Sequence, residues 1–234
     1  MWSGPRNIST AMMRSWENRA DTVVIDEPFY AYYLVQTGVD HPGRDTILAA
    51  HDADADQVAG MLVGTVPSGK NVFYQKHMAH HLLEGMDRAW LASVTNCFLI
   101  RDPRAMVASL HARTPYPSIE DTGLPQQRAL FDEVHERTGT VPPVLDSHDV
   151  LSDPRGVLGR FCLAVGVEFD EAMLAWPAGP RSSDGAWAPW WYDSVEASTG
   201  FSPPRTGDVG LPSELEPLVA SCCEHYEHLH RHRL

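Results

Sequence analysis

Short apolar runs along this chain each break off into a polar or charged cluster, and the pattern occurs five times. The runs are Met1–Trp2, Thr22–Ile25, Asn71–Gln75, Cys97–Ile100 and Pro143–Leu145. Such short, continuous runs are typical of strands buried in a parallel sheet. In such a sheet, ligands bind outside the carboxyl ends of the strands. We therefore expect the clusters that follow the runs to line one active-site edge.

Helical patterns separate the predicted strands. Expected helices cover residues 9–19, 78–92, 103–113, 125–138, 153–165 and 213–234, and residues 28–63 combine helices with a loop. This alternation predicts the α/β class, as a doubly wound, mainly parallel sheet flanked by helices. No internal repeat or linker divides residues 1–234, so we expect a single domain. Within it, residues 176–212 are irregular, rich in proline and hold four of the seven tryptophans; this segment could cover a site.

The first predicted strand is unusually short. Only Met1 and Trp2 precede Ser3-Gly4, whereas a phosphate-binding loop normally follows a complete strand. Three explanations stay open: a very short strand, a true start further upstream, or a partner that covers this edge of the sheet.

Composition excludes several classes of protein. The formal net charge of −13 argues against a general nucleic-acid binder, which needs a basic face. No apolar stretch approaches the ~20 residues of a membrane span, and no secretion leader is visible. The four cysteines have no CxxC spacing, which suits a reducing compartment. We therefore expect a cytoplasmic protein without a membrane or nucleic-acid partner.

The segment Gly4–Thr10 is the first candidate binding site. It is a Gly-Pro-Arg loop that runs into a helix start, where free backbone N–H groups and the helix dipole attract an anion. It is not an ATP-binding Walker loop, because Ser9-Thr10-Ala11 replaces Gly-Lys-Ser/Thr. An ordinary capped helix after a Gly-Pro turn is the simpler alternative.

A second cluster, Arg101-Asp102-Pro103-Arg104, follows the fourth predicted strand, and Ser109 lies eight residues after Arg101. An arginine at a strand end and a hydroxyl two turns into the next helix could hold a phosphate, the arginine in bidentate fashion. A surface Asp–Arg pair beside a helix start is the alternative.

In order and spacing, these motifs resemble sulfotransferases that use 3′-phosphoadenosine 5′-phosphosulfate (PAPS). The shared features are a Pro-Arg/Lys-x-x-x-Thr loop and an Arg-Asp-Pro-Arg cluster with Ser eight residues after its first Arg. Residues 151–154 and 161–167 look like the family's Asp-Pro … Leu-Gly-Leu segment. The chain is most similar to a bacterial sulfotransferase-like subgroup that carries Trp-Ser-Gly-Pro-Arg-Asn-Ile-Ser-Thr and Asp-Glu-Pro-Phe-Tyr. The resemblance covers roughly residues 1–170 and implies a P-loop-like fold with PAPS as cofactor.

The resemblance also implies a role for each matching position. Arg6 would contact the sulfuryl group, Arg101 and Ser109 would hold the 3′-phosphate, and Glu27 would be a general base. The loop as a whole would bind the cofactor, with the 5′-phosphate held by Asn7, Ser9 and Thr10; its residues are Gly4, Pro5, Arg6, Asn7, Ile8, Ser9 and Thr10. Ile8 departs from the family, since many members have glycine there. The basic loop that closes over the 3′-phosphate has no clear match, and Ser198, Thr199, Gly200 and Phe201, with Arg205, are our candidates for it.

The chemistry of sulfuryl transfer points to the same side chains. As in phosphoryl transfer, positioned cations stabilise the developing charge, so Arg6 and Lys76 could act without a metal. The acceptor needs a base, and Glu27 follows a buried strand beside Asp26, whose charge would raise its pKa. A salt-bridged carboxylate is the alternative reading of Glu27. His77 is the rival base, although a lone histidine after a strand is more often structural.

A zinc site is not expected. His77 and His81 would share a helix face, but no third ligand is evident.

The sequence thus predicts a sulfotransferase of secondary metabolism that acts on a hydroxyl or amine of a small or carrier-attached metabolite. A non-catalytic or partner-dependent subunit of a biosynthetic complex is the alternative, and a P-loop small-molecule kinase is a third possibility. No residue names the acceptor, and either a homo-oligomer or a partner subunit is open.

Overall fold

The computed structural model describes residues 1–204 and 210–234. Its strands are β1 (Trp2–Ser3), β2 (Thr22–Asp26), β3 (Val72–Met78), β4 (Phe98–Ile100) and β5 (Val144–Asp146). Its α-helices are α1 (Ser9–Glu17), α2 (Tyr30–Thr37), α3 (Arg44–Ala50), α4 (Ala55–Leu62), α5 (Pro103–His111), α6 (Leu124–Thr138), α7 (Ser147–Ser152), α8 (Pro154–Ala164), α9 (Ala188–Trp191), α10 (Asp193–Glu196) and α11 (Glu216–His230). The predicted α/β class is confirmed, and each of the five apolar runs contributes to a strand.

The five strands form one parallel sheet in the order β2-β3-β1-β4-β5. Although β1 has only two residues, it pairs with β3 on one side and β4 on the other. It is therefore a central strand, and the idea that a partner covers its edge was wrong.

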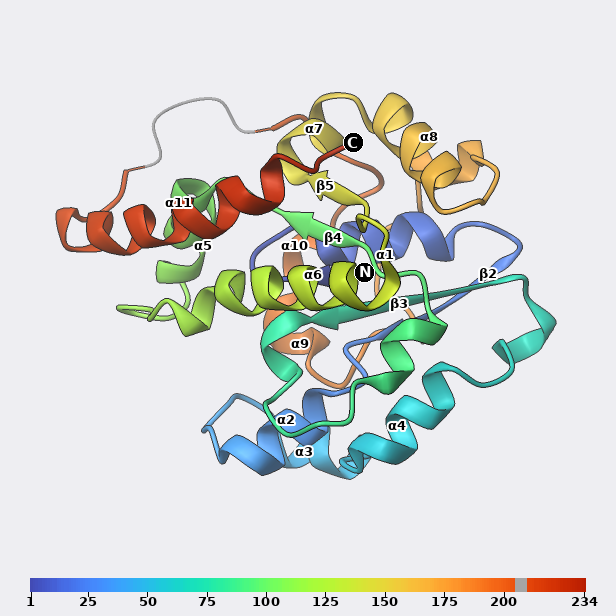
Figure 1. Cartoon of the computed structure of the whole chain (residues 1–234), viewed down its shortest axis with the longest axis horizontal. Coiled ribbons are helices and arrows are strands. Elements are labelled where there is room, and N and C mark those ends of the chain that lie inside the picture. The colour runs from blue at the N-terminus through green and yellow to red at the C-terminus, as the bar shows by residue number, and fades with distance from the viewer. Residues whose placement is uncertain (205–209) are drawn as a thin grey trace.

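Side chains alternate between the two faces of the sheet, as the period of a strand requires. Leu99 and Leu145 pack with α1 and α8 in one core, whereas Phe98, Ile100 and Val144 pack with α6 and α11 in the other. Figure 1 shows α6 crossing one face of the sheet with α1 on the other. Because α1 follows β1 and α6 lies between β4 and β5, the chain changes faces between β1 and β4. This is the topological switch point, where α/β sheets bind ligands.

Two further cores lie beside the sheet. Helices α2 and α3, at the bottom of Figure 1, pack on Trp187 and Tyr192 of the irregular segment. Helix α5 packs on α11. The irregular segment is thus part of the packed structure, with two single-turn helices, α9 and α10.

One predicted helix is wrong. Residues 78–92 form no α-helix; they contain two 3₁₀ turns, η2 (Ala79–His81) and η3 (Ala89–Ser93). Between them Gly85 has a φ of 88°, and the side chain of Asp87 accepts the backbone N–H of Ala89. Both features end helical geometry locally.

Candidate functional site

The loop after β1 fits against the turn before α6 because it begins with glycine. A Cβ on Gly4 would lie 2.3 Å from the carbonyl oxygen of Thr122. From the other side, a Cβ on Gly123, whose φ is 69°, would lie 3.1 Å from the Cα of Gly4. Glycines at both positions therefore let the two backbones touch.

Arg6 is held at the centre of the loop by the residues that the sequence singled out. It has a φ of 60°, a conformation that non-glycine residues adopt rarely and that gathers at functional sites. Arg101 Nη1 donates to its carbonyl oxygen at 2.5 Å. Arg6 Nε donates to Ser109 Oγ at 3.1 Å. The structure thus brings together groups that lie about a hundred residues apart in the chain.

The amino terminus of α1 faces the same place without a cap. Ile8 occupies the N-cap position and makes no side-chain cap hydrogen bond, and the first turn of α1 carries no acidic residue. Among the described residues, no side chain accepts the first N–H groups. The free N–H groups of the first turn and the helix dipole therefore favour an anion. Ile8 has a φ of −84°, which any residue adopts, and its side chain packs on the core. Its departure from glycine leaves the loop conformation intact.

The charges around the loop are positive. Burial lowers the pKa of Arg6, and the guanidinium of Arg113 lowers it further. An arginine in this setting gains from an incoming anion, because an anion offsets both effects. Asn7 Oδ1 is also buried without a hydrogen-bond partner in the described residues, but as an acceptor it offers nothing to an anion. The donor set fits a ligand with more than one phosphate group.

Two amide side chains fasten the loop to the sheet. Asn7 Nδ2 donates to the carbonyl oxygen of Leu99 at 2.9 Å. From α6, the fully buried Gln127 donates to Leu99 O at 3.0 Å and to Trp2 O at 3.3 Å. Gln127 thus ties α6 to β1 and β4 at the switch point. No spacing in the sequence marks Gln127 for this role.

A second cluster lies at the ends of β2 and β3, where Glu27, Asp26 and Lys76 meet. Strand β3 lies between the end of β2, where Asp26 and Glu27 stand, and the loop after β1, which corresponds to about 10 Å at the usual strand spacing. Lys76 Nζ donates to Asp26 Oδ1 at 2.8 Å, to Glu27 Oε1 and to Tyr192 Oη at 3.1 Å. These three contacts use all three N–H groups of the ammonium, which is fully buried. The geometry assigns Lys76 to Glu27 and Asp26 rather than to a sulfuryl group at the loop.

Glu27 is held in a form suited to accept a proton. Its φ is 37°, an uncommon value for a residue other than glycine. Burial raises the pKa of Glu27 to about 7; Lys76 opposes the rise and Asp26 adds to it. Burial also opposes the charge on Lys76, but Asp26 and Glu27 raise its pKa well above the ordinary value. A carboxyl group whose pKa lies near 7 matches the requirement for a general base.

His77, the rival base, points the other way. Its ring stacks on Trp2 at 4.3 Å between centroids and lies 5.8 Å from Phe29. Burial lowers its pKa well below the ordinary range. Because a residue next to Lys76 on a strand must face the opposite side of the sheet, His77 belongs to the core.

His81 is the histidine that faces Glu27. Its Nδ1 lies 3.9 Å from Glu27 Oε2, and its ring stacks on Tyr30 and Tyr33. Burial lowers its pKa well below the ordinary value, so the ring is neutral. His77 and His81 do not share a helix face. Among the described residues, no three His, Cys, Asp or Glu side chains gather in a way that could hold a metal.

Thr199 and Gly200 lie away from the loop. Gly200 pairs with Ala175, and Thr199 O accepts the N–H of Trp176. Asn18, just beyond the last turn of α1, donates to Ala175 O, so this segment lies at the end of α1 opposite the loop. Arg205, named with them, lies outside the described residues.

A cavity of about 420 Å³ opens at the other edge of the sheet, where the strands begin; Trp16, Asn71, Tyr74, Asn96 and Cys97 are among its lining residues. Neither Glu27 nor Lys76 nor a residue of the Gly4–Thr10 loop lines it, although Gln75 and His77, on either side of Lys76 in β3, do.

In the described part of the chain, no helix is long and apolar enough to span a membrane.

The fold and the two clusters define a class: a parallel α/β protein that presents an uncapped helix terminus, a pair of arginines and a buried acid–base group at one sheet edge. Comparison with known proteins gives the family. Residues 1–230 match the model of the sulfotransferase domain, and the chain belongs to this family.

Two curated proteins of Arabidopsis thaliana are similar along almost the whole chain. They are branched-chain-amino-acid aminotransferase-like proteins 1 and 2, which are 34% and 33% identical over 99% of this chain. The chain spans 41% of the length of each. Their names describe the longer proteins.

Two solved structures share the fold. The sulfotransferase domain of the Synechococcus PCC 7002 olefin synthase has a TM-score of 0.53 at 17% identity, over 97% of this chain and 92% of its own. The sulfotransferase domain from the curacin biosynthetic pathway has a TM-score of 0.50 at 13% identity, over 97% and 95%.

Proposed function

We propose that this protein transfers the sulfuryl group of PAPS to a hydroxyl or amine group of a small or carrier-attached metabolite. The observation that carries the proposal is the joining of Arg6, Ser109 and Arg101 beside the uncapped amino terminus of α1. Membership of the sulfotransferase family agrees with it.

Different residues would bind the two phosphate groups of the nucleotide. The N–H groups at Ser9 and Thr10 would hold the 5′-phosphate, and Arg101 with Ser109 would hold the 3′-phosphate. Arg6 would stabilise the charge that develops between the sulfuryl group and the phosphate that leaves. When bound, the nucleotide supplies the sulfuryl group and this leaving phosphate.

Glu27 would take the proton of the acceptor. A hydroxyl has a pKa far above 7, so a base must remove its proton as the new bond forms. Glu27 is buried, its pKa is about 7, and it lies on the same sheet edge as the loop. We assign this role to Glu27 rather than to His77, because the ring of His77 stacks on Trp2.

Two observations that motivated a non-catalytic, partner-dependent subunit have ordinary explanations. Strand β1, although short, pairs with β3 on one side and β4 on the other, and Ile8 adopts a common backbone conformation. We therefore favour an enzyme that completes its own nucleotide site.

The test is calorimetric titration with the product nucleotide, adenosine 3′,5′-bisphosphate. We expect binding that Arg101→Ala weakens by about 10- to 100-fold, as for the loss of a charged hydrogen bond. Arg155→Ala, which removes an arginine from an exposed pair with Glu171, is the matched control and should bind like the wild type. Absence of binding at millimolar nucleotide would sink the proposal.

A further inference from the structure

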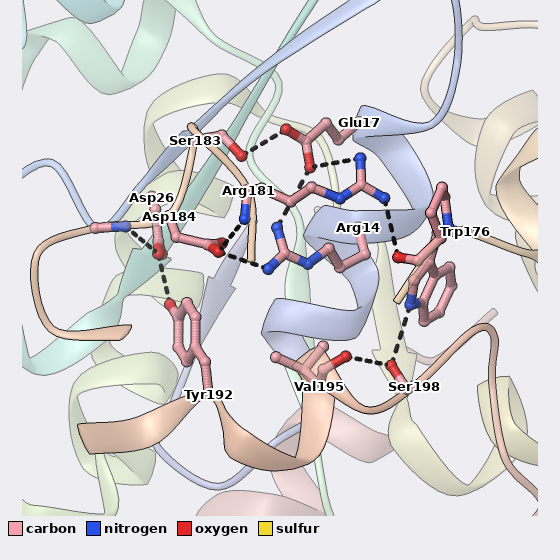
Figure 2. A network of polar contacts seen from close by, with 12 residues as sticks. Arg14, Glu17, Asp26, Trp176, Arg181, Ser183, Asp184, Tyr192, Val195 and Ser198 are labelled. Atoms are coloured by element: carbon pink, nitrogen blue, oxygen red, sulfur yellow. Dashed lines mark hydrogen bonds and ion pairs between the residues drawn. The ribbon is translucent and has the colours of Figure 1, made fainter. Parts of the chain in front are cut away.

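The irregular segment of residues 176–204 contacts the Glu27 cluster and donates hydrogen bonds to Asp26. Tyr192 Oη donates to Asp26 Oδ2 at 2.5 Å, and the backbone N–H of Gly185 donates to the same oxygen at 3.2 Å. Figure 2 shows both contacts from the segment that follows Asp184. From the sequence we expected only that this segment could cover a site, because no spacing connects residue 192 to residue 26.

The segment is fastened so that this contact is fixed. Arg14, fully buried in α1, bonds to Asp184 at 2.7 Å, and the backbone N–H of Arg181 donates to the same carboxylate at 2.7 Å. Ser183 donates to Glu17, one turn further along α1. Helix α1 thus carries the loop at its amino end and anchors the segment along its side.

Tyr192 itself has no freedom to turn away. Its hydroxyl accepts from Lys76 Nζ and from Trp187 Nε1, each at 3.1 Å, while it donates to Asp26. Trp187 is 1% exposed and Tyr192 is 4% exposed, and both pack on α2 and α3. Trp187 covers Gly185, where a Cβ would lie 2.1 Å from its ring. The hydroxyl is therefore held in a buried site by three partners.

We propose that Tyr192 is a positioning residue for the base: its hydroxyl bridges Asp26 and Lys76 and so keeps the Lys76 ammonium placed between Asp26 and Glu27. This rests on the proposed function, in which Glu27 takes the acceptor proton. Tyr192 acts through Lys76 and Asp26 and does not touch substrate in this role.

The bridge sets the ionisation of Glu27. By donating to Asp26, the hydroxyl offsets part of the negative charge that would repel an ionised Glu27. Without it, Asp26 draws the Lys76 ammonium towards itself. Both effects favour the protonated form of Glu27.

Several other titratable or charged groups lie near Glu27, on the elements packed around it. The titratable and charged groups around Glu27 are Asp26 on β2, Lys76 on β3, His80 and His81 on η2, Tyr30 and Tyr33 on α2, and His41 and His51 from the segments around α3. His77 on β3 faces the other side of the sheet.

The experiment follows Glu27 directly in the full chain by carboxyl ¹³C NMR of protein labelled at glutamate, with Glu27→Gln used to assign the resonance. In Tyr192→Phe we expect the titration of Glu27 to move to higher pH by about half a unit or more. An unchanged titration, or a shift to lower pH, would overturn the proposal.

Tyr226→Phe is the matched control. Tyr226 Oη donates to Asp146 Oδ2 at 2.7 Å at the end of β5, so this variant loses the same kind of contact at another strand. It should leave the Glu27 titration in place. An equal shift in both variants would show a general loosening and overturn the specific role of Tyr192.

Trp187→Phe provides a second route if Tyr192→Phe does not fold. It removes the N–H that holds the Tyr192 hydroxyl while it keeps an aromatic ring. We expect a smaller shift in the same direction, and no shift would count against the bridge.

The titration needs neither nucleotide nor acceptor, so its result is separable from the proposed function. A shift in Tyr192→Phe, together with no binding of adenosine 3′,5′-bisphosphate by the wild type, would retain the bridge and reject the sulfotransferase. Nucleotide binding by the wild type, with no shift of the Glu27 titration in Tyr192→Phe, would retain the sulfotransferase and reject the bridge.

Discussion

At the scale of single residues, two adjacent carboxylates have been given different surroundings. Asp26 accepts three hydrogen bonds, from Lys76, Tyr192 and Gly185. Glu27 shares Lys76 but otherwise faces the neutral ring of His81 at 3.9 Å. Neighbouring acids that differ in this way can be assigned different tasks. In the proposed function, Asp26 therefore belongs to the framework and Glu27 is the group that exchanges a proton.

The raised pKa of Glu27 predicts a pH dependence of stability. Its pKa moves from 4.5 to about 7 on folding, so between these values the folded state binds a proton that the unfolded chain has released. The free energy of unfolding therefore falls as pH rises through this window, by up to about 1.4 kcal/mol per unit from this group.

Denaturant unfolding of the wild type and of Glu27→Gln across this pH window measures the effect. The buried histidines contribute with the opposite sign, because burial lowers the pKa of His77, His80 and His81. The difference between the two proteins isolates Glu27. A difference that does not change between pH 4.5 and 7 would contradict the raised pKa.

Gly4→Ala should damage the loop. The new Cβ would lie 2.3 Å from Thr122 O, a backbone atom that cannot move by itself. We expect a loss of about 2 kcal/mol or more in the free energy of unfolding, with weaker nucleotide binding. Gly159→Ala in α8, where nothing lies within 4 Å, is the control and should stabilise by about 0.5–1 kcal/mol. Equal stability of the two variants would refute the close approach.

At the scale of elements, α1 has two tasks that its sequence shows only in part. Its amino terminus presents free N–H groups to an anion, and its side binds the segment that carries Tyr192 through Arg14 and Glu17. A buried ion pair such as Arg14–Asp184 specifies one arrangement, since removal of one partner leaves a charge without compensation.

Asp184→Ala tests this anchor. With Arg14 only 1% exposed, we expect a loss of about 3–5 kcal/mol in the free energy of unfolding. Limited proteolysis should cut within residues 176–198 faster than in the wild type. Glu171→Ala breaks the exposed pair with Arg155 and should change neither measurement. Wild-type resistance to proteolysis in Asp184→Ala would show that the ion pair does not hold the segment.

At the scale of the whole molecule, the switch point joins two halves of the sheet. The loop comes from β1, and Arg101 and Ser109 come from β4 and α5. A nucleotide with phosphates at both ends would bridge them and stabilise the folded state as a whole.

Thermal unfolding with nucleotides checks this bridge. At 100 times its dissociation constant, adenosine 3′,5′-bisphosphate should add about 2.7 kcal/mol, which raises Tm by roughly 5–10 °C for a chain of this size. At the same concentration, adenosine 5′-phosphate lacks the group for Arg101 and should raise Tm far less. Equal shifts would show that the 3′-phosphate makes no contact with the protein.

Local pattern was enough to predict most of the fold. Four of the five apolar runs end within one residue of the end of a strand. Pro103 and Pro154 stand in the first turns of α5 and α8, and Gly166 follows α8 with a φ of 72°. Each of these features depends on residues that are adjacent in the chain, so it can be read from the sequence. The same reasoning predicted a helix wrongly over residues 78–92. There the conformation of Gly85 and the hydrogen bond from Ala89 N–H to the Asp87 side chain prevailed over the apolar periodicity.

The sequence by itself determined the strands, their polar endings and the motif order that led to the sulfotransferase family. It also supplied Arg6, Arg101, Ser109 and Glu27 as candidates, because parallel strands bring their carboxyl ends to one edge. Only the tertiary structure decided that Lys76 is enclosed between two carboxylates, that His77 faces the core and that Tyr192 completes the network. Those outcomes depend on contacts between segments 50 to 166 residues apart, which arise from packing in three dimensions and leave no spacing in the chain.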